Sequence, residues 1–298
     1  MKKLVALMLV GAMTAAMVTG CGSSADTSAS TDAAAEDTAA DAEATEDTAE
    51  AAEDTAADAK SDLAYVKEKG TLVVGITEFE PMDYKDENGE WIGFDADMAK
   101  AFAESLGVTA EFQVIDWDNK ILELEGKTID CVWNGMTLTD EVTSAMECTD
   151  AYLNNAQVVV VPADVADQYQ DEESLKDLSF AVEAGSAGEA EVSALGLNYT
   201  PVSSQADALM EVASKSSDAA VIDSLMAGAM IGEGTGYADL TYTIGLNSEE
   251  YGVGFRKGSD LAAALNDYFT TSLEDGSMEK VAETYAISLH ARYTSLPK

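Results

Sequence analysis

Positive charge is what this sequence has least of. Its 298 residues include 16 lysines and arginines against 56 aspartates and glutamates, which gives a formal net charge of −40. Only two of the basic residues are arginines, Arg256 and Arg292. A field of this sign repels phosphate backbones, so we expect no nucleic-acid partner.

Histidine and cysteine are scarce as well. The single histidine, His290, excludes a site built from several imidazoles. Three cysteines are too few for a disulfide scaffold. We therefore expect no metal site; we also expect no catalytic group and no cofactor.

The first twenty residues have the pattern of an export signal. Two lysines, Lys2 and Lys3, precede an apolar run over residues 4–18, and the run ends in Val-Thr-Gly before Cys21. The run is too short, and too rich in alanine and glycine, for a good membrane span. The string ending at Cys21 resembles the lipobox of bacterial lipoproteins, in which the cysteine is lipidated. An ordinary signal peptide followed by a chance cysteine is the alternative.

Residues 21–59 are predicted to be an acidic, disordered tether. Residues 22–59 hold 15 Ala, 12 Asp or Glu, 6 Thr and 4 Ser, with no basic, aromatic or large aliphatic residue. Such a segment cannot bury enough apolar surface to offset the entropy of ordering. A long alanine-rich helix is the rival, but closely spaced like charges oppose it.

The remaining cysteines, Cys131 and Cys148, leave two alternatives open. In an exported protein they could form a disulfide. Two buried free thiols are the other interpretation, because unpaired cysteine behaves as a small apolar residue.

The chain after residue 60 reads as α/β. Apolar runs with the features of strands alternate with segments of helical period, which favours predominantly parallel sheets. The expected strands are residues 71–76, 110–114, 129–133, 157–161, 180–183, 219–222 and 251–256. The expected helices are residues 95–106, 206–214, 224–231, 261–273 and 278–285. About 238 residues suit two units of ordinary domain size.

Three predicted loops follow strands, at the edge where open α/β sheets bind ligands. They are residues 78–84 (EFEPMDY), 134–139 (NGMTLT) and 184–188 (AGSAG). Small and hydroxyl residues let a backbone approach a ligand and offer donors that suit a carboxylate. Each loop alone could equally be a plain turn.

A longer series of motifs carries a resemblance to a known family. The series is GTLVVG at 70–75, YKDENG at 84–89, GFDADMAKA at 93–101, KTID at 127–130, NGMTLT at 134–139, AGS at 184–186, SDAAVID at 217–223 and GVGFRKG at 252–258. In this order it resembles the substrate-binding proteins of polar amino-acid ABC importers, bacterial solute-binding protein family 3. The resemblance covers nearly all of residues 61–285.

The resemblance implies an α/β, two-lobed periplasmic-binding-protein type II fold, often called a Venus flytrap, with a hinge of two chain crossings. On this basis we expect lobe I to comprise residues 61–155 and 248–290. Lobe II is expected to comprise residues 156–247.

The family binds its ligand between the lobes, and the resemblance assigns roles to matching positions. Phe79 and Trp117 would form apolar walls, although each could instead belong to the core. Asp223 would take the ligand's ammonium, although it could be only a helix N-cap. The ligand carboxylate would be held by backbone and hydroxyl groups of one further set of residues: Asn134, Gly135, Thr137, Ser186, Ala187 and Gly188.

One departure from the family concerns its arginine, which usually stands five positions after the loop threonine and binds the ligand carboxylate. Val142 stands there in this sequence, and residues 1–255 contain no arginine. Backbone donors, a nearby lysine, or a ligand without a carboxylate could account for this. Glu183, where the family often has a small or apolar residue, adds negative charge. These changes favour a basic or neutral ligand over an acidic one.

The sequence therefore predicts a lipid-anchored extracytoplasmic protein that captures a small polar solute, an amino acid or related amine. Its partners would be ABC permease subunits and, through Cys21, the membrane; we expect a monomer. A ligand-sensing lipoprotein is the alternative. A dehydratase is known on this fold, but such enzymes use arginine anchors that are lacking here.

Overall fold

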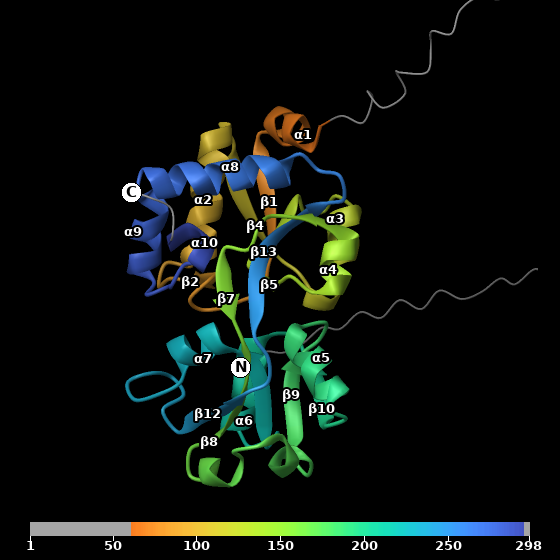
Figure 1. Cartoon of the computed structure of the whole chain (residues 1–298), viewed down its shortest axis with the longest axis vertical. Helices are drawn as coiled ribbons and strands as arrows, with labels where there is room; N and C mark the ends of the chain where they lie inside the picture. The colour runs from red at the N-terminus through yellow and green to blue at the C-terminus, as the bar shows by residue number, and fades with distance from the viewer. Residues whose placement is uncertain (1–60, 295–298) are drawn as a thin grey trace, which may run out of the picture. The chain divides into compact units, whose positions relative to one another are not determined.

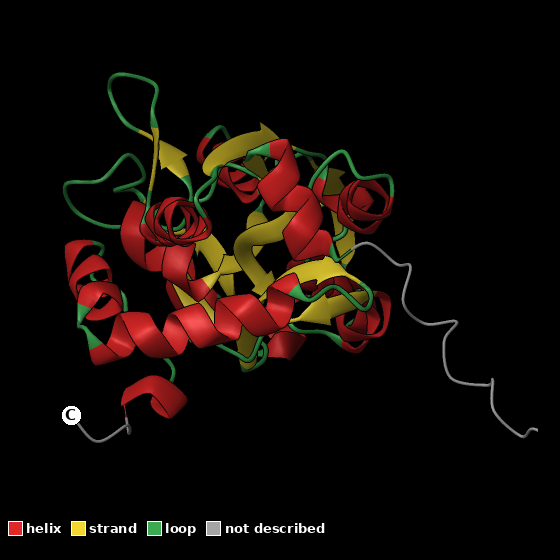
Figure 2. Cartoon of the chain, turned by 90° about the horizontal axis from the view of Figure 1, so that it is seen from above, coloured by secondary structure: helices red, strands yellow, loops and turns green. Residues whose placement is uncertain are grey.

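The computed structural model describes residues 61–294. The predicted signal peptide, Cys21 and the predicted tether lie outside these residues. Seen from above, the helices surround the strands (Figure 2). Within the described part of the chain, no helix is both long enough and apolar enough to cross a membrane.

The first of two main sheets has the strand order β4-β1-β5-β13-β6, with β7 also paired to β13. Strand β1 runs parallel to β4 and β5, whereas β13 runs antiparallel to β5, β6 and β7. The strands are β1 (Thr71–Ile76), β4 (Thr109–Val114), β5 (Cys131–Thr137), β6 (Met146–Cys148), β7 (Leu153–Asn155) and β13 (Glu249–Arg256).

Helices cover both faces of this sheet. Figure 1 shows α2, α8 and α9 on one side and α3 and α4 on the other. Helix α2 buries Met98 and Phe102 and ends at Gly107, whose left-handed backbone (φ 78°) lets its N–H bond back to the last turn. The helices are α1 (Asp62–Lys69), α2 (Phe94–Leu106), α3 (Lys120–Glu125), α4 (Asp140–Ala145), α8 (Leu261–Glu274), α9 (Ser277–Thr284) and α10 (Ala291–Thr294).

The second sheet has the order β10-β9-β11-β8-β12. Strand β9 is parallel to β10 and β11, and β8 is antiparallel to β11 and β12. The elements are β8 (Gln157–Pro162), β9 (Ser179–Glu183), α5 (Ala187–Ala194), β10 (Asn198–Val202), α6 (Gln205–Ala213), β11 (Ala219–Asp223), α7 (Ser224–Met230) and β12 (Leu240–Gly245). A separate hairpin pairs β2 (Tyr84–Lys85) with β3 (Trp91–Ile92), and short 3-10 turns are η1 (Trp117–Asn119), η2 (Ala166–Gln168) and η3 (Glu172–Leu175).

The chain passes between the two sheets twice. Only Ala156 separates β7 of the first sheet from β8 of the second, and residues 246–248 lead back from β12 to β13. Glu249 pairs with Asn155 in the ladder between β13 and β7, so the two crossings lie side by side. The two passages therefore meet at one narrow connection.

One predicted loop proves to be part of a strand. Residues 134–137 continue β5, where we expected the strand to end at residue 133. The ladder between β5 and β13 shifts register here, and Gly135 has a left-handed backbone (φ 56°). Between the pairs Gly252–Met136 and Gly254–Val132, β5 has two more residues than β13. Extra residues in one strand bend the ladder and re-aim side chains, so the loop-like composition marks an irregular strand.

The two cysteines are not joined. Cys131 on β5 pairs with Phe255, and Cys148 on β6 pairs with the neighbouring Gly254, so β13 lies between them. Two strand spacings put their backbones about 9.5 Å apart, too far for a disulfide without backbone movement. Both are free thiols, and burial is the main cause that raises each pKa. The disulfide alternative is therefore wrong for this structure.

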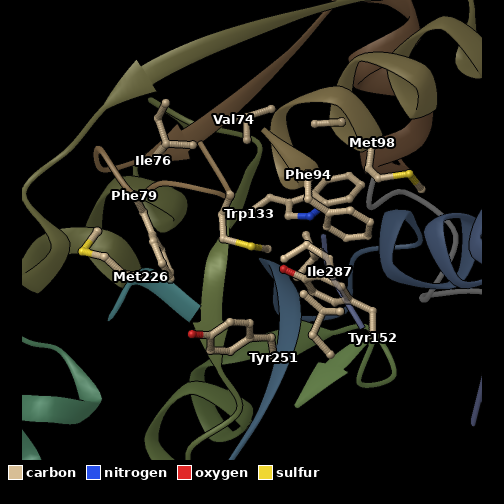
Figure 3. Close-up of a cluster of buried hydrophobic side chains, with 14 of the residues drawn as sticks. Val74, Ile76, Phe79, Phe94, Met98, Trp133, Tyr152, Met226, Tyr251 and Ile287 are labelled. Atoms are coloured by element: carbon tan, nitrogen blue, oxygen red, sulfur yellow. The ribbon is translucent and has the colours of Figure 1, made fainter. Parts of the chain in front are cut away.

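The largest apolar cluster draws on both sheets. Trp133 and Tyr251 come from the first sheet, Val158 from the second, and Met226 from α7. Figure 3 shows Phe79 pointing toward Tyr251, and their rings meet edge to face with centroids 6.5 Å apart. The apolar packing therefore continues from the first sheet to the second.

Arg256 attaches the first helix to the sheet. Its Nε donates to the Asp62 carboxylate over 3.0 Å, and its Nη1 donates to the Ile129 carbonyl over 2.9 Å. Asp260 accepts from the Ser61 hydroxyl and, over 2.9 Å, from the Leu63 N–H. Arg256 is thus committed to structural contacts.

Candidate ligand-binding site

A cavity of about 230 Å³ lies between the ends of the two sheets. From the first sheet it is lined by η1, the bent part of β5 and the start of α4. From the second it is lined by the ends of β9 and β11, the loop before α5, and the first residues of β8 and α6. A space of this size suits a small metabolite.

The structure brings most of the predicted site residues to this cavity. Seven of them line it: Trp117, Asn134, Gly135, Thr137, Ser186, Ala187 and Asp223. Val142, at the position of the family arginine, lines it as well. Phe79 and Gly188 do not.

Phe79 lies behind the cavity wall. Its side chain is 2% exposed, and a Cβ added to Gly135 would come within 2.6 Å of the Phe79 ring. Phe79 therefore packs under Gly135 and shapes the wall from below. The core alternative describes it better than direct ligand contact.

Gly188 faces the second sheet. A Cβ there would come within 2.9 Å of the Gln157 side chain and 3.1 Å of the Val221 carbonyl. The missing side chain lets α5 approach β11 closely. Gly185, by contrast, faces η1, where a Cβ would lie 2.6 Å from the Asp118 Cα.

Asp223 ends β11 and is 4% exposed. Its carboxylate accepts hydrogen bonds from the side-chain amides of Asn155, Gln157 (2.6 Å) and Gln205. Burial, and then Glu249, raise its pKa to about 7, and the amide hydrogen bonds act the other way. It stands at the N-cap position of α7, but its side chain makes no capping bond. The three amide hydrogen bonds, and not a capping bond to α7, therefore fix the position of this carboxylate at the cavity.

Glu183 is a second buried acid at the cavity. It ends β9 and is 2% exposed, and its Oε1 has no hydrogen-bond partner among the described residues. Burial raises its pKa to about 8, and the charge of Asp223 adds to the rise. A buried carboxyl with an unused oxygen favours a donor or a cation beside it.

Two amide side chains connect Asp223 to the chain crossings. Asn155 and Gln157 both donate to Asp223 and also to the Glu249 Oε1, the latter over 2.6 and 2.8 Å. The Thr137 hydroxyl donates to the same Glu249 oxygen over 3.0 Å. Both crossings and the bent strand therefore share one polar network with the cavity acid.

The donors of β5 at the cavity are already engaged. The Asn134 Nδ2 donates to the Thr77 carbonyl (3.0 Å) and to Asp83 (2.8 Å). The Gly135 N–H donates to the buried Asp95 over 2.7 Å. The Thr137 hydroxyl serves Glu249. The side-chain hydrogens of Asn134 and Thr137 and the Gly135 N–H are therefore already used within the protein.

The second sheet offers donors that are less committed. The Ser186 Oγ accepts from the Glu189 N–H over 3.1 Å as the N-cap of α5, which leaves its own proton to donate. Ala187 begins that helix, and the first N–H groups of a helix have no partner within it. Both residues border the cavity.

Lys120 is the basic residue that lines the cavity, and the sequence did not single it out. It begins α3 and is 8% exposed, and its Nζ donates to the carbonyls of Trp117 (3.2 Å) and Gly185 (2.8 Å). It lies 5.1 Å from the centre of the Trp117 ring. Burial lowers its pKa, whereas Glu141 and Glu183 raise it.

Trp117 is 8% exposed and lines the cavity, so its indole can serve as an apolar wall while it packs in the core.

Among residues 61–294, no group of histidine, cysteine, aspartate and glutamate side chains is arranged to hold a metal ion.

Comparison with known proteins identifies the family. A sequence model of the bacterial extracellular solute-binding proteins, family 3, matches residues 72–288. The chain belongs to this family. The family predicted from the motif series, and with it the two-lobed fold, is confirmed.

Several relatives of this family 3 member are named for the ligands that they bind. The arginine-binding extracellular protein ArtP of Bacillus subtilis (strain 168) is 28% identical over 227 residues, which cover 73% of this chain and 86% of ArtP. The L-cystine-binding protein TcyJ of Escherichia coli (strain K12) is 25% identical over 74% of this chain and 84% of TcyJ. A cyclohexadienyl dehydratase of Pseudomonas aeruginosa is 32% identical over 83 residues, 28% of this chain and 31% of the enzyme.

Solved structures match over most of the described residues. A mutant of ArgBP from T. maritima superposes with a TM-score of 0.71 at 32% identity, covering 75% of this chain and 98% of that one. A histidine-bound ABC uptake substrate-binding protein from Streptococcus pneumoniae gives 0.68 at 27% identity, covering 76% and 96%. An ancestral amino acid-binding protein, a precursor of cyclohexadienyl dehydratase, gives 0.69 at 32% identity, covering 76% and 99%.

Proposed function

We propose that this family 3 member is an extracytoplasmic binding lipoprotein of an ABC importer. It captures a small amino acid or related amine in the cavity and delivers it to a permease. The names of the relatives support the ligand class, since they bind arginine, cystine and histidine. The lipobox-like string at Cys21 supports the anchor, and the composition of residues 21–59 supports a tether.

The proposal divides the molecule into two moving parts. Lobe I comprises residues 61–155 and 248–290 around the first sheet, and lobe II comprises residues 156–247 around the second. The hinge lies at residues 155–157 and 244–248. The adjacent crossings support this division, because a narrow double connection absorbs rotation while each sheet stays rigid.

The observation that carries the ligand assignment is the buried Asp223 at the cavity. A carboxylate held by three amides and removed from water is preorganised for a cation. We assign to it the ligand's α-ammonium, with Trp117 as the apolar wall.

The cavity charges favour a basic or neutral ligand. Four acidic residues line the cavity against one basic residue, Lys120. The acidic residues are Asp140, Glu141, Glu183 and Asp223. An acidic side chain would meet the negative charge of Asp140 and Glu141, whereas a basic one would find Glu183 with an unused oxygen and would favour its ionised form. We therefore rank arginine, lysine, histidine and neutral polar amino acids above glutamate and aspartate.

Titration calorimetry on the full-length protein in mild detergent tests this ranking. L-arginine, L-lysine, L-histidine, L-cystine and L-glutamine are compared with L-glutamate and L-aspartate at pH 8. Tight binding of at least one basic or neutral amino acid, and weak binding of both acidic ones, is expected. Tight binding of glutamate or aspartate would refute the ligand class. Absence of binding to all of these amino acids and to the amines agmatine, cadaverine and histamine would refute the proposed function.

Uptake of the bound amino acid by cells tests delivery. Deletion of the gene should reduce uptake of the radiolabelled ligand, and expression of the full chain should restore it. Unchanged uptake together with loss of a ligand-dependent response would support the ligand-sensing alternative instead.

A further inference from the structure

The cavity lacks a cation at Val142, the position where the family has its carboxylate-binding arginine. Val142 is 4% exposed and has no polar atom to offer at that position. The nearby donors of Asn134 and Gly135 are bonded to Asp83 and Asp95. If the ligand is an amino acid, as proposed above, its carboxylate needs positive charge from elsewhere.

Lys120 lines the same cavity as Val142 and has donor capacity to spare. An ammonium has three protons, and the Lys120 Nζ uses two, toward the carbonyls of Trp117 and Gly185. Within residues 61–294, Lys120 forms no ion pair with a carboxylate at 4.0 Å or less. A buried ammonium bonded only to neutral carbonyls gains from a carboxylate on its remaining proton.

Its neighbours connect Lys120 to both halves of the carboxylate subsite. Glu141 and Val142, near the start of α4, line the same cavity as Lys120. On the other side, Gly185 directly precedes Ser186, whose hydroxyl has a proton to donate. The cation is thus set between the start of α4 and the start of α5.

We propose that Lys120 supplies the positive charge that binds the ligand's α-carboxylate, in place of the arginine that Val142 replaces. Ser186 and the Ala187 N–H add neutral hydrogen bonds. Lysine is a compact point charge and cannot grip two oxygens in the forked manner of a guanidinium. The cavity therefore recognises one carboxylate oxygen by charge and the other by hydrogen bonds.

A different role for Lys120 makes a different prediction. Its bond to the Gly185 carbonyl joins α3 of the first sheet to the loop before α5 of the second. If this hydrogen bond were the whole contribution of Lys120, replacing Lys120 would lower the affinity for every ligand equally, with or without a carboxylate.

The test compares amino acids with the amines that lack only the carboxylate. L-arginine is paired with agmatine, L-lysine with cadaverine and L-histidine with histamine. Calorimetry is run on the full-length protein in detergent for the wild type, Lys120→Met, Lys120→Gln and Lys120→Arg. Lys176→Met is the control, because Lys176 is exposed and remote from the cavity.

The wild type should prefer the best-bound amino acid over its amine by at least about 30-fold. Lys120→Met and Lys120→Gln should reduce this preference to less than about threefold, mainly by weakening the amino acid. Lys120→Arg should keep much of it, and Lys176→Met all of it. Adding Val142→Arg to Lys120→Met should restore preference for the carboxylate.

Three results overturn the inference while leaving amino-acid binding intact. One is equal wild-type affinity for amino acid and amine, which needs no variant. Another is a wild-type preference that survives in Lys120→Met or Lys120→Gln, and the third is an equal loss for both ligands of a pair. Binding of an amine without binding of any amino acid overturns this inference alone, whereas absence of binding to every amino acid and amine tested overturns the proposed function itself, and this inference with it.

Discussion

The substitution Asp223→Asn examines the central assumption about the cavity. It removes the charge but keeps the size of the side chain and an oxygen that can accept from the surrounding amides. Since the carboxylate is 4% exposed, little water would screen its attraction for an ammonium. Truncating one partner of such a pair costs about 2–5 kcal/mol, which corresponds to a loss of about 30- to 4,000-fold in affinity for L-arginine.

Glu249→Gln is the matched control for this substitution. Glu249 accepts from the same amides of Asn155 and Gln157 as Asp223 does, but it does not line the cavity. It therefore shares the network and lacks the proposed ligand contact. Calorimetry at pH 8, above the pKa of about 7 for Asp223, should show a large loss for Asp223→Asn and a small one for Glu249→Gln.

The pH dependence gives a second measurement on the same proteins. Because burial raises the pKa of Asp223 to about 7, lowering the pH from 8 to 6 protonates it and should weaken the wild type's binding of L-arginine. Asp223→Asn should lack this component. If Asp223→Asn binds L-arginine as tightly as the wild type at pH 8, the assignment of the ammonium to Asp223 is refuted.

Three further substitutions test other features. Glu183→Gln concerns stability: the folded-state pKa of Glu183 is raised from 4.5 to about 8, so its contribution is fully present below pH 4.5 and is lost as the pH rises through 8. Thermal unfolding should show the wild type losing up to about 1.4 kcal/mol per pH unit relative to Glu183→Gln between pH 5 and 8; parallel curves would contradict this. Gly185→Ala should weaken ligand binding because its Cβ would lie 2.6 Å from the Asp118 Cα. Gly196→Ala is the control, because Gly196 has a similar φ of 66° and open space around it. It should lose only about 1–2 kcal/mol of folding stability to the left-handed backbone, without a loss of ligand affinity. Equal affinities for these two variants would argue against a close approach at Gly185. Cys21→Ser should release the protein from the membrane fraction without changing ligand affinity, and retention would count against lipidation.

The fold could be predicted because its signals are local and ordered. Apolar runs such as residues 71–76 and 219–222 are continuous enough to identify buried strands, and both are strands in the structure. The bend in β5 was harder to predict. Residues 134–137 have the composition of a turn, but their pairing with β13, more than a hundred residues away, keeps them in the sheet.

The site was only partly predictable, because hydrogen-bond partners are distant in sequence. Asn134 and Gly135 looked like free donors, but Asp83 and Asp95 consume their hydrogens. Phe79 looked like a wall and lies beneath one. Lys120 had the look of a solvated residue on a short helix, and its burial depends on the Gly185 loop, 65 residues later. Of the cavity residues that were not assigned to the ligand in advance, Glu183 did have a signal in the sequence, because it is an acidic residue at the end of an apolar strand.

The attachment of the first helix has a mechanical consequence. A pull applied to the chain before Ser61 reaches α1 first, and α1 is held from two directions. Asp62 is bonded to Arg256 at the end of β13, and Ser61 and Leu63 are bonded to Asp260 just before α8. These bonds direct the load into β13, which pairs with three strands of its sheet, and into the start of a 14-residue helix. Tension on the N-terminal side is therefore carried by the first sheet and bypasses both the chain crossings and the cavity.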